Sequence, residues 1–291
     1  MQHRDICDAC GGRDRKPFPA DTIWPVVVCS CGFVYLSCAP EYAALASDLA
    51  WEKTSLAEKK RRRSRPFGWL DEKTRWRMKI GHIIDRRRNK AILGGQGSVL
   101  DIGCGPSCRV PPGPIPFGIE ISESLAEMAV THFAARGGRV VTGPALHALD
   151  LFPNAAFSAI LMRSYLEHEA APLAVLRKGH AKLAPGGIIH VRVPDFGSLN
   201  RRVMGKSWCG YRFPDHVNYF TGVSLRAMAA RAGLAYRRLN WLSPFDDNII
   251  AELSKRHLSC SGEDDLVEDD GRLHVVVGSV TAGAGGAGRY A

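Results

Sequence analysis

The sequence has no long run of apolar residues. Among its 291 residues, no stretch approaches the ~20 apolar residues that a membrane-spanning helix needs. The start, Met1-Gln2-His3-Arg4-Asp5, does not lead into the apolar segment of a signal peptide. We therefore expect a cytoplasmic protein without a membrane partner.

Cysteine is scarce over most of the chain, which argues against a disulfide scaffold. Five of the nine cysteines fall within the first 38 residues, and clustering of this kind favours a metal site in a reducing compartment. The pair Cys7-x-x-Cys10-Gly is typical of a zinc knuckle and, together with Cys29-x-Cys31-Gly, predicts a closed, structural Zn²⁺ site. The second pair is unusually tight, so Cys38 is an alternative ligand. Free cysteines without a metal are the other interpretation.

Excess charge is confined to one segment. Residues 51–90 carry 15 Lys or Arg against 5 Asp or Glu, a difference equal to the +10 formal charge of the whole chain. The segment indicates either a solvated helix face or an attraction for an acidic partner. That partner would be an acidic or nucleotide-linked small molecule, an acidic carrier protein or nucleic acid.

The centre of the sequence predicts a nucleotide site. An apolar strand at 98–102 runs into Gly103 and Gly105, which allow a sharp turn and a close backbone approach to a ligand. A second strand ends on Glu120, whose carboxylate is placed to accept both hydroxyls of a ribose. From residue 98 onward strands and helices alternate, which predicts a parallel sheet covered by helices, an α/β architecture.

These motifs resemble a known family. Val99-Leu100-Asp101-Ile102-Gly103-Cys104-Gly105 and Gly118-Ile119-Glu120-Ile121-Ser122 resemble the first two motifs of class I S-adenosylmethionine (SAM)-dependent methyltransferases, and Ala184-Pro185-Gly186-Gly187 resembles a later turn. The resemblance covers about residues 98–280. It implies a Rossmann-like, seven-stranded methyltransferase sheet and SAM as cofactor. It also implies the cofactor-binding residues, which are Asp101, Gly103, Cys104, Gly105, Glu120, Ile121, Ala145, Leu146 and Arg163.

Three positions depart from the family pattern. Ser107 stands where a third glycine is usual, and Pro144 follows the third strand where an acidic residue often meets the adenine amine. The segment 108–117 contains four prolines in place of the usual helix, because proline breaks helix interiors.

Two further motifs narrow the resemblance. Leu166-Glu167-His168 and His216-Val217-Asn218-Tyr219-Phe220, together with an N-terminal zinc ribbon, resemble bacterial sugar C-methyltransferases and relatives in polysaccharide and natural-product pathways. The resemblance implies a small-molecule acceptor and a catalytic group of His216, His168, Tyr165 and Tyr219. We predict that His216 is the general base, with His168 as the competing candidate.

The predicted organisation has four parts: a zinc ribbon at 1–40, a helical basic connector at 41–95, a methyltransferase domain at 96–281 and a disordered tail at 282–291. We expect strands at 235–239 and 274–280 to complete the sheet as a hairpin. One alternative is a zinc-ribbon protein that binds or methylates nucleic acid, although the sequence has no Asn/Asp-Pro-Pro-Tyr/Phe motif. The other is an inactive fold. The acceptor, the methylated atom and the oligomeric state are not specified.

Overall fold

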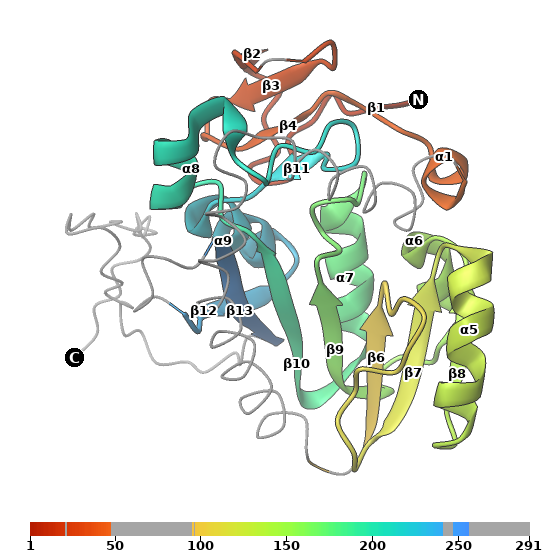
Figure 1. Ribbon diagram of the computed structural model, residues 1–291. Helices are drawn as coiled ribbons and strands as arrows, with labels where there is room; N and C mark the ends of the chain where they lie inside the picture. Colours follow the sequence, from red (N-terminus) through yellow and green to blue (C-terminus); the bar gives the residue numbers. More distant parts are fainter. Residues whose placement is uncertain (21, 48–94, 96, 241–246, 256–291) are drawn as a thin grey trace, which may run out of the picture. The chain divides into compact units, whose positions relative to one another are not determined.

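The structure is a computed structural model that describes residues 1–20, 22–47, 95, 97–240 and 247–255 (Figure 1). The basic segment 51–90, the expected strand at 274–280 and the expected tail at 282–291 lie outside these residues. Within the described residues, no helix is long and apolar enough to cross a membrane.

A seven-stranded sheet forms the centre of the protein, in the order β12-β13-β10-β9-β6-β7-β8. The pairs β10–β9, β9–β6, β6–β7 and β7–β8 are parallel, whereas β13 runs antiparallel to both β10 and β12. This confirms the predicted mostly parallel α/β sheet. Its strands are β6 (Ser98–Ile102), β7 (Ile115–Glu120), β8 (Arg139–Thr142), β9 (Phe157–Arg163), β10 (Leu183–Pro194), β12 (Leu234–Arg238) and β13 (Asn248–Lys255).

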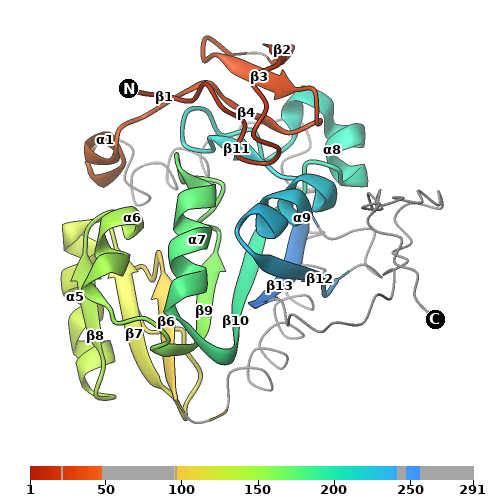
Figure 2. The ribbon, with the colours of Figure 1, turned by 180° about the vertical axis from the view of Figure 1, so that it is seen from behind.

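Helices connect these strands and cover them, and α7 and α9 lie in front of the sheet in Figure 2. Their starts follow local chemistry: the Ser122 and Thr221 side chains cap α5 and α9, and Pro172 occupies the first turn of α7. The helices are α5 (Glu123–Ala134), α6 (Ala145–Ala148), α7 (Pro172–Lys182), α8 (Leu199–Met204) and α9 (Gly222–Arg231), with 3₁₀ turns at Leu149–Leu151 and Gly205–Ser207.

The last strand of the sheet differs from our prediction. The strand that we expected at 274–280 lies outside the described residues, and β13, at Asn248–Lys255, which we did not predict, pairs with β12. Ile249, Ala251 and Leu253 are fully buried in the main core. Burial between β10 and β12 fits this segment to a central position in the sheet, because β-propensity depends on packing context.

The N-terminal residues form a small sheet of their own, which includes a strand from far along the chain. Its order is β11-β4-β3-β2, so that β11 (Asn218–Tyr219) pairs antiparallel with β4 (Val34–Leu36). The other strands are β2 (Arg15–Pro17) and β3 (Val26–Cys29), while β1 (Gln2–His3) pairs with β5 (Cys38–Ala39) and α1 spans Tyr42–Ala46. β3 and β4 lie on either side of the turn that contains Cys31.

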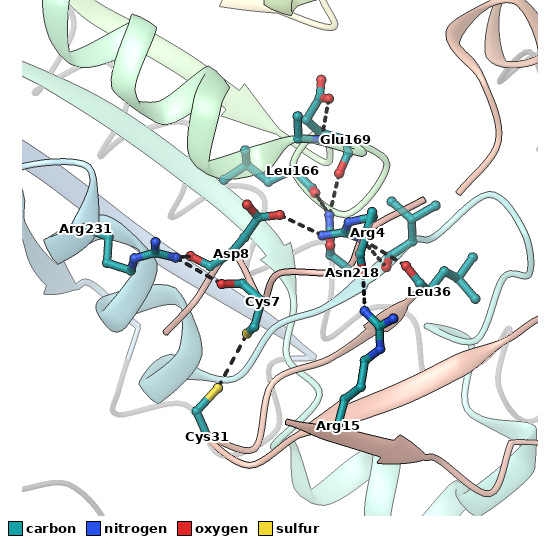
Figure 3. A network of polar contacts seen from close by, with 12 residues as sticks. Arg4, Cys7, Asp8, Arg15, Cys31, Leu36, Leu166, Glu169, Asn218 and Arg231 are labelled. Carbon is teal, nitrogen blue, oxygen red and sulfur yellow. Dashed lines mark hydrogen bonds and ion pairs between the residues drawn. The ribbon is translucent and has the colours of Figure 1, made fainter. Parts of the chain in front are cut away.

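Polar contacts join this N-terminal segment to the elements around the seven-stranded sheet (Figure 3). Arg231, at the end of α9, donates hydrogen bonds to the carbonyls of Cys7 and Asp8 at 3.0 and 2.7 Å. Arg4 is 7% exposed, forms an ion pair with Asp8 at 3.0 Å and donates to the Val217 carbonyl at 3.3 Å. The cysteine-containing segment is therefore packed against α9 and against the residues that precede β11.

Candidate active site

A cavity of about 350 Å³ opens at the carboxyl ends of the parallel strands. This edge of an open α/β sheet is where such folds bind ligands, and the volume is in the usual range for small-molecule sites. The cavity wall combines the loop after β6, the ends of β7 and β9, the start of α6 and a residue of α1. Predicted site residues in this wall are Gly103, Cys104, Gly105, Glu120, Ile121, Ala145, Arg163, Tyr165 and His168.

The turn after β6 is made by glycines with positive φ. Gly103 has φ +70° and a Cβ there would contact the Tyr165 ring at 3.4 Å, whereas Gly105 has φ +65° and open space where a Cβ would stand. Glu120 sits at the end of β7 beside this turn, 7% exposed. Its two carboxylate oxygens accept hydrogen bonds from the backbone N–H groups of Gly105, at 2.8 Å, and Ser122, at 3.0 Å.

Asp101 lies beneath the cavity and does not line it. It is fully buried, and its Oδ2 accepts a hydrogen bond from the Arg163 guanidinium at 2.9 Å, while Arg109 approaches at 3.9 Å. Its Oδ1 is buried without a hydrogen-bond partner among the described residues. A buried carboxylate oxygen of this kind is costly unless a ligand or water satisfies it.

The side of the cavity after β8 is apolar. Pro144 and Ala145 line it, but Leu146, which we predicted to contact the cofactor, does not. The Leu146 carbonyl instead accepts a hydrogen bond from Lys178 at 2.7 Å. Recognition of an adenine edge at this position would therefore depend on backbone groups near Pro144 and Ala145.

The cavity also has a polar end, which contains two residues that sequence reasoning missed. The hydroxyls of Tyr42 and Tyr165 each donate a hydrogen bond to the Glu169 carboxylate, one to each oxygen. Burial and the negative charge of Glu169 raise the pKa of both tyrosines. Tyr42 reaches the cavity from α1, in a segment that we assigned to the connector, and no local pattern marks it.

His168 is held by Asp215 at this polar end. Its Nδ1 lies 2.9 Å from both the backbone carbonyl oxygen and Oδ1 of Asp215, and Arg212 forms an ion pair with the other carboxylate oxygen. Burial alone would lower the pKa of His168, but the charge and hydrogen bond of Asp215 outweigh it and raise the value to about 9.

His216 lies behind His168 and does not line the cavity. The two rings meet edge to face with centroids 4.7 Å apart, and the His216 Nδ1 is 2.9 Å from the Gly210 carbonyl. Burial and the neighbouring His168 hold the pKa of His216 well below its usual value. Tyr219 is buried away from the cavity too, and its hydroxyl donates to the His216 carbonyl at 3.0 Å. Of the predicted catalytic group, only Tyr165 and His168 meet the cavity.

The four N-terminal cysteines form a separate cluster. Their sulfur atoms lie within 4.8 Å of one another, with 3.7 Å between Cys7 and Cys31 and 3.5 Å between Cys10 and Cys29. A disulfide would need about 2.05 Å, and all four cysteines are free. Cys38, the alternative ligand, lies in β5 and is not a member of this cluster.

Comparison with known families identifies the class of protein. Residues 70–239 match a family model described as a methyltransferase domain. The match covers more than half of the chain, so the chain belongs to this methyltransferase family, and its activity class is SAM-dependent methyl transfer. A search of curated proteins finds no match.

The chain is also similar to solved structures, at low sequence identity. A SAM-dependent methyltransferase from Archaeoglobus fulgidus is 16% identical, with a TM-score of 0.48 over 59% of this chain and 92% of that chain. Magnesium protoporphyrin IX methyltransferase from Synechocystis, solved with bound S-adenosylhomocysteine, is 16% identical, with a TM-score of 0.49 over 74% and 98%. A 1,6-didemethyltoxoflavin-N1-methyltransferase from Burkholderia thailandensis is 16% identical, with a TM-score of 0.47 over 84% and 100%.

Proposed function

We propose that this methyltransferase moves a methyl group from SAM to a small-molecule acceptor bound at the polar end of the cavity. One observation carries the proposal. A single cavity of about 350 Å³ connects the glycine turn and Glu120 with the polar group of Tyr165, His168 and Glu169. Donor and acceptor would therefore meet in one cavity, and alignment is the main task of such an enzyme because the sulfonium already activates the methyl group.

The cofactor half of the cavity fits SAM. Each carboxylate oxygen of Glu120 accepts one backbone N–H, and an ionised carboxylate has about four acceptor positions. Two positions therefore remain for the two ribose hydroxyls. The open space beside Gly105 admits a ligand close to the backbone.

The acceptor half indicates which residues would contact the substrate. His168 and Tyr165 line the cavity, whereas His216, our predicted base, lies behind His168. We therefore place His168 at the acceptor and assign His216 and Tyr219 to its support. Glu169 and Tyr42 would close the same end through the two tyrosine hydroxyls.

The cysteine cluster fits structural zinc. Tetrahedral coordination with Zn–S distances of about 2.3 Å places the sulfur atoms about 3.8 Å apart, close to the 3.7 and 3.5 Å between the paired thiols. We propose that Cys7, Cys10, Cys29 and Cys31 hold one Zn²⁺, which would fix the fold of the N-terminal sheet and leave no open position for catalysis.

The nature of the acceptor is a finer hypothesis. The basic segment 51–90 favours an acidic or nucleotide-linked sugar or natural-product intermediate over a neutral one. The test compares each acceptor in its free form with the same acceptor linked to a nucleoside diphosphate. Release of S-adenosylhomocysteine measures the turnover of each form. Turnover of the linked forms is expected. A wild-type protein that binds no SAM by calorimetry would overturn the proposed function, and equal turnover of neutral acceptors would overturn only the acidic preference.

A further inference from the structure

Two histidines and a glutamate that no part of the proposed function fully explains converge beside the cavity. One potential ligand atom from each of Glu167, His168 and His216 lies within 4.8 Å of the others. Glu167 and His168 follow β9, whereas His216 precedes β11. The three residues therefore come from two loops that are far apart in the sequence.

Each histidine makes its hydrogen bond through Nδ1, so Nε2 is the nitrogen left to bind an ion, and binding at His168 would displace a proton because Asp215 raises its pKa. The His168 Nδ1 is taken by Asp215 at 2.9 Å, and the His216 Nδ1 is taken by the Gly210 carbonyl at 2.9 Å. Metal-binding histidines usually donate one ring N–H to a carboxylate or a backbone carbonyl, which fixes the ring and leaves the other nitrogen for the ion. Both histidines have this arrangement.

Glu167 supplies the negative charge. It is 1% exposed, and its Oε2 is buried without a hydrogen-bond partner among the described residues. An ionised carboxylate buried without such a partner is strongly unfavourable. A cation between this oxygen and the two histidine nitrogens would remove that cost.

The two loops are bound firmly to each other, so the three side chains are held in place before any ligand arrives. The Glu167 carbonyl accepts hydrogen bonds from the N–H groups of Val217, at 2.7 Å, and Asn218, at 3.1 Å. The Asn218 side chain donates to the carbonyls of Leu166 and Glu169, both at 2.7 Å (Figure 3). A site whose ligands are already positioned binds an ion without a large ordering cost.

We propose that Glu167, His168 and His216 bind one divalent transition-metal ion, separate from the ion of the cysteine cluster. Two imidazoles and one carboxylate suit Fe²⁺, Mn²⁺ or Zn²⁺ and leave open coordination positions. Because His168 lines the cavity, the ion would lie at the cavity wall. This deepens the proposed function, on which it rests: the acceptor would bind the ion through an oxygen, such as a hydroxyl or carboxylate group.

The test uses the full-length protein with zinc retained in the cysteine cluster. This protein is titrated with Mn²⁺, and binding is measured by electron paramagnetic resonance. Thiolates prefer Zn²⁺ to Mn²⁺, so the cysteine cluster does not compete for the probe. We expect one Mn²⁺ per chain in the wild type and no detectable binding in Glu167→Gln and His216→Ala. His132→Ala, which alters an exposed histidine on α5, is the matched control and should bind Mn²⁺ normally.

A positioning variant and a folding measurement keep the result interpretable. Asp215→Asn should weaken Mn²⁺ binding about 10- to 100-fold, the usual effect of changing a group that orients a metal ligand. Mn²⁺ should raise the thermal unfolding temperature of the wild type but not of Glu167→Gln. Wild-type protein that binds no Mn²⁺, or folded ligand variants that bind it as tightly as the wild type, would overturn the proposal. SAM affinity, measured separately by calorimetry, tests the proposed function alone.

Discussion

Glu120→Gln is the sharpest test of the proposed cofactor site, because it changes charge with little change of shape. In the structure both carboxylate oxygens accept backbone N–H groups, from Gly105 and Ser122. Glutamine keeps one acceptor oxygen and replaces the other with an NH₂ group, which cannot accept. One backbone N–H then faces a donor, and the position that would bind a ribose hydroxyl on that side is lost.

The expected loss follows from these contacts. A hydrogen bond to a charged group contributes about 1.5–3 kcal/mol, which corresponds to SAM binding about tenfold to about 150-fold weaker. Part of the same loss should appear as lower stability, since Glu120 is 7% exposed and its backbone partners are close to it. Glu127→Gln, at an exposed position on α5, is the control and should change neither quantity.

The assay combines calorimetric titration with SAM and chemical unfolding of the same preparations. Unfolding by denaturant separates a variant that has lost affinity from one that has lost its fold. The reasoning about Glu120 would be refuted by a folded Glu120→Gln protein that binds SAM with wild-type affinity. An equal loss in Glu127→Gln would show that the effect is general electrostatics and not the ribose contact.

Four further outcomes are expected. Loss of the cysteine-bound zinc in Cys29→Ser, which leaves the proposed site at Glu167 intact, should unfold the N-terminal sheet and abolish turnover while SAM still binds, as checked by metal analysis and calorimetry. Tyr42→Phe should cost about 1.5–3 kcal/mol in denaturant unfolding, because it removes a hydrogen bond to a charged group. Gly138→Ala should cost about 3 kcal/mol or more in the same assay, since a Cβ would lie 1.6 Å from the Pro116 carbonyl oxygen. Fluorescence anisotropy should show no tight, salt-sensitive binding of RNA or DNA by the basic segment 51–90.

The sequence was most informative where short-range patterns determine structure. The strand, glycine turn and second strand around Gly103 and Glu120 require particular residue types at adjacent positions, and the structure has each of them in the predicted place. The Ser122 cap and the strand β9 were predictable for the same reason. These features depend on backbone geometry and hydrophobic alternation that can be seen within a few residues.

Contacts between distant segments were not predictable. Tyr42 and Glu169 meet across 127 positions of sequence separation, and nothing near either residue marks it as part of a site. The choice of His216 as base came from its motif, but the motif does not show which of two neighbouring histidines faces the cavity. The packing of the two loops through Val217 and Asn218 determines that His168, and not His216, faces the cavity.

The predicted boundary at residue 40 separates two parts that the fold connects through hydrogen bonds. Strand β4, between the cysteine pairs and α1, pairs with β11, which begins two residues after His216. The Leu36 N–H also donates to the Val217 carbonyl at 2.9 Å, so the backbone next to His216 is fixed by the N-terminal sheet. Loss of the cysteine-bound ion would therefore release one side of the acceptor end, while Gly103, Gly105 and Glu120 keep their places on β6 and β7. For this reason we expect zinc removal to separate turnover from cofactor affinity, which would not happen if the N-terminal segment were an independent domain.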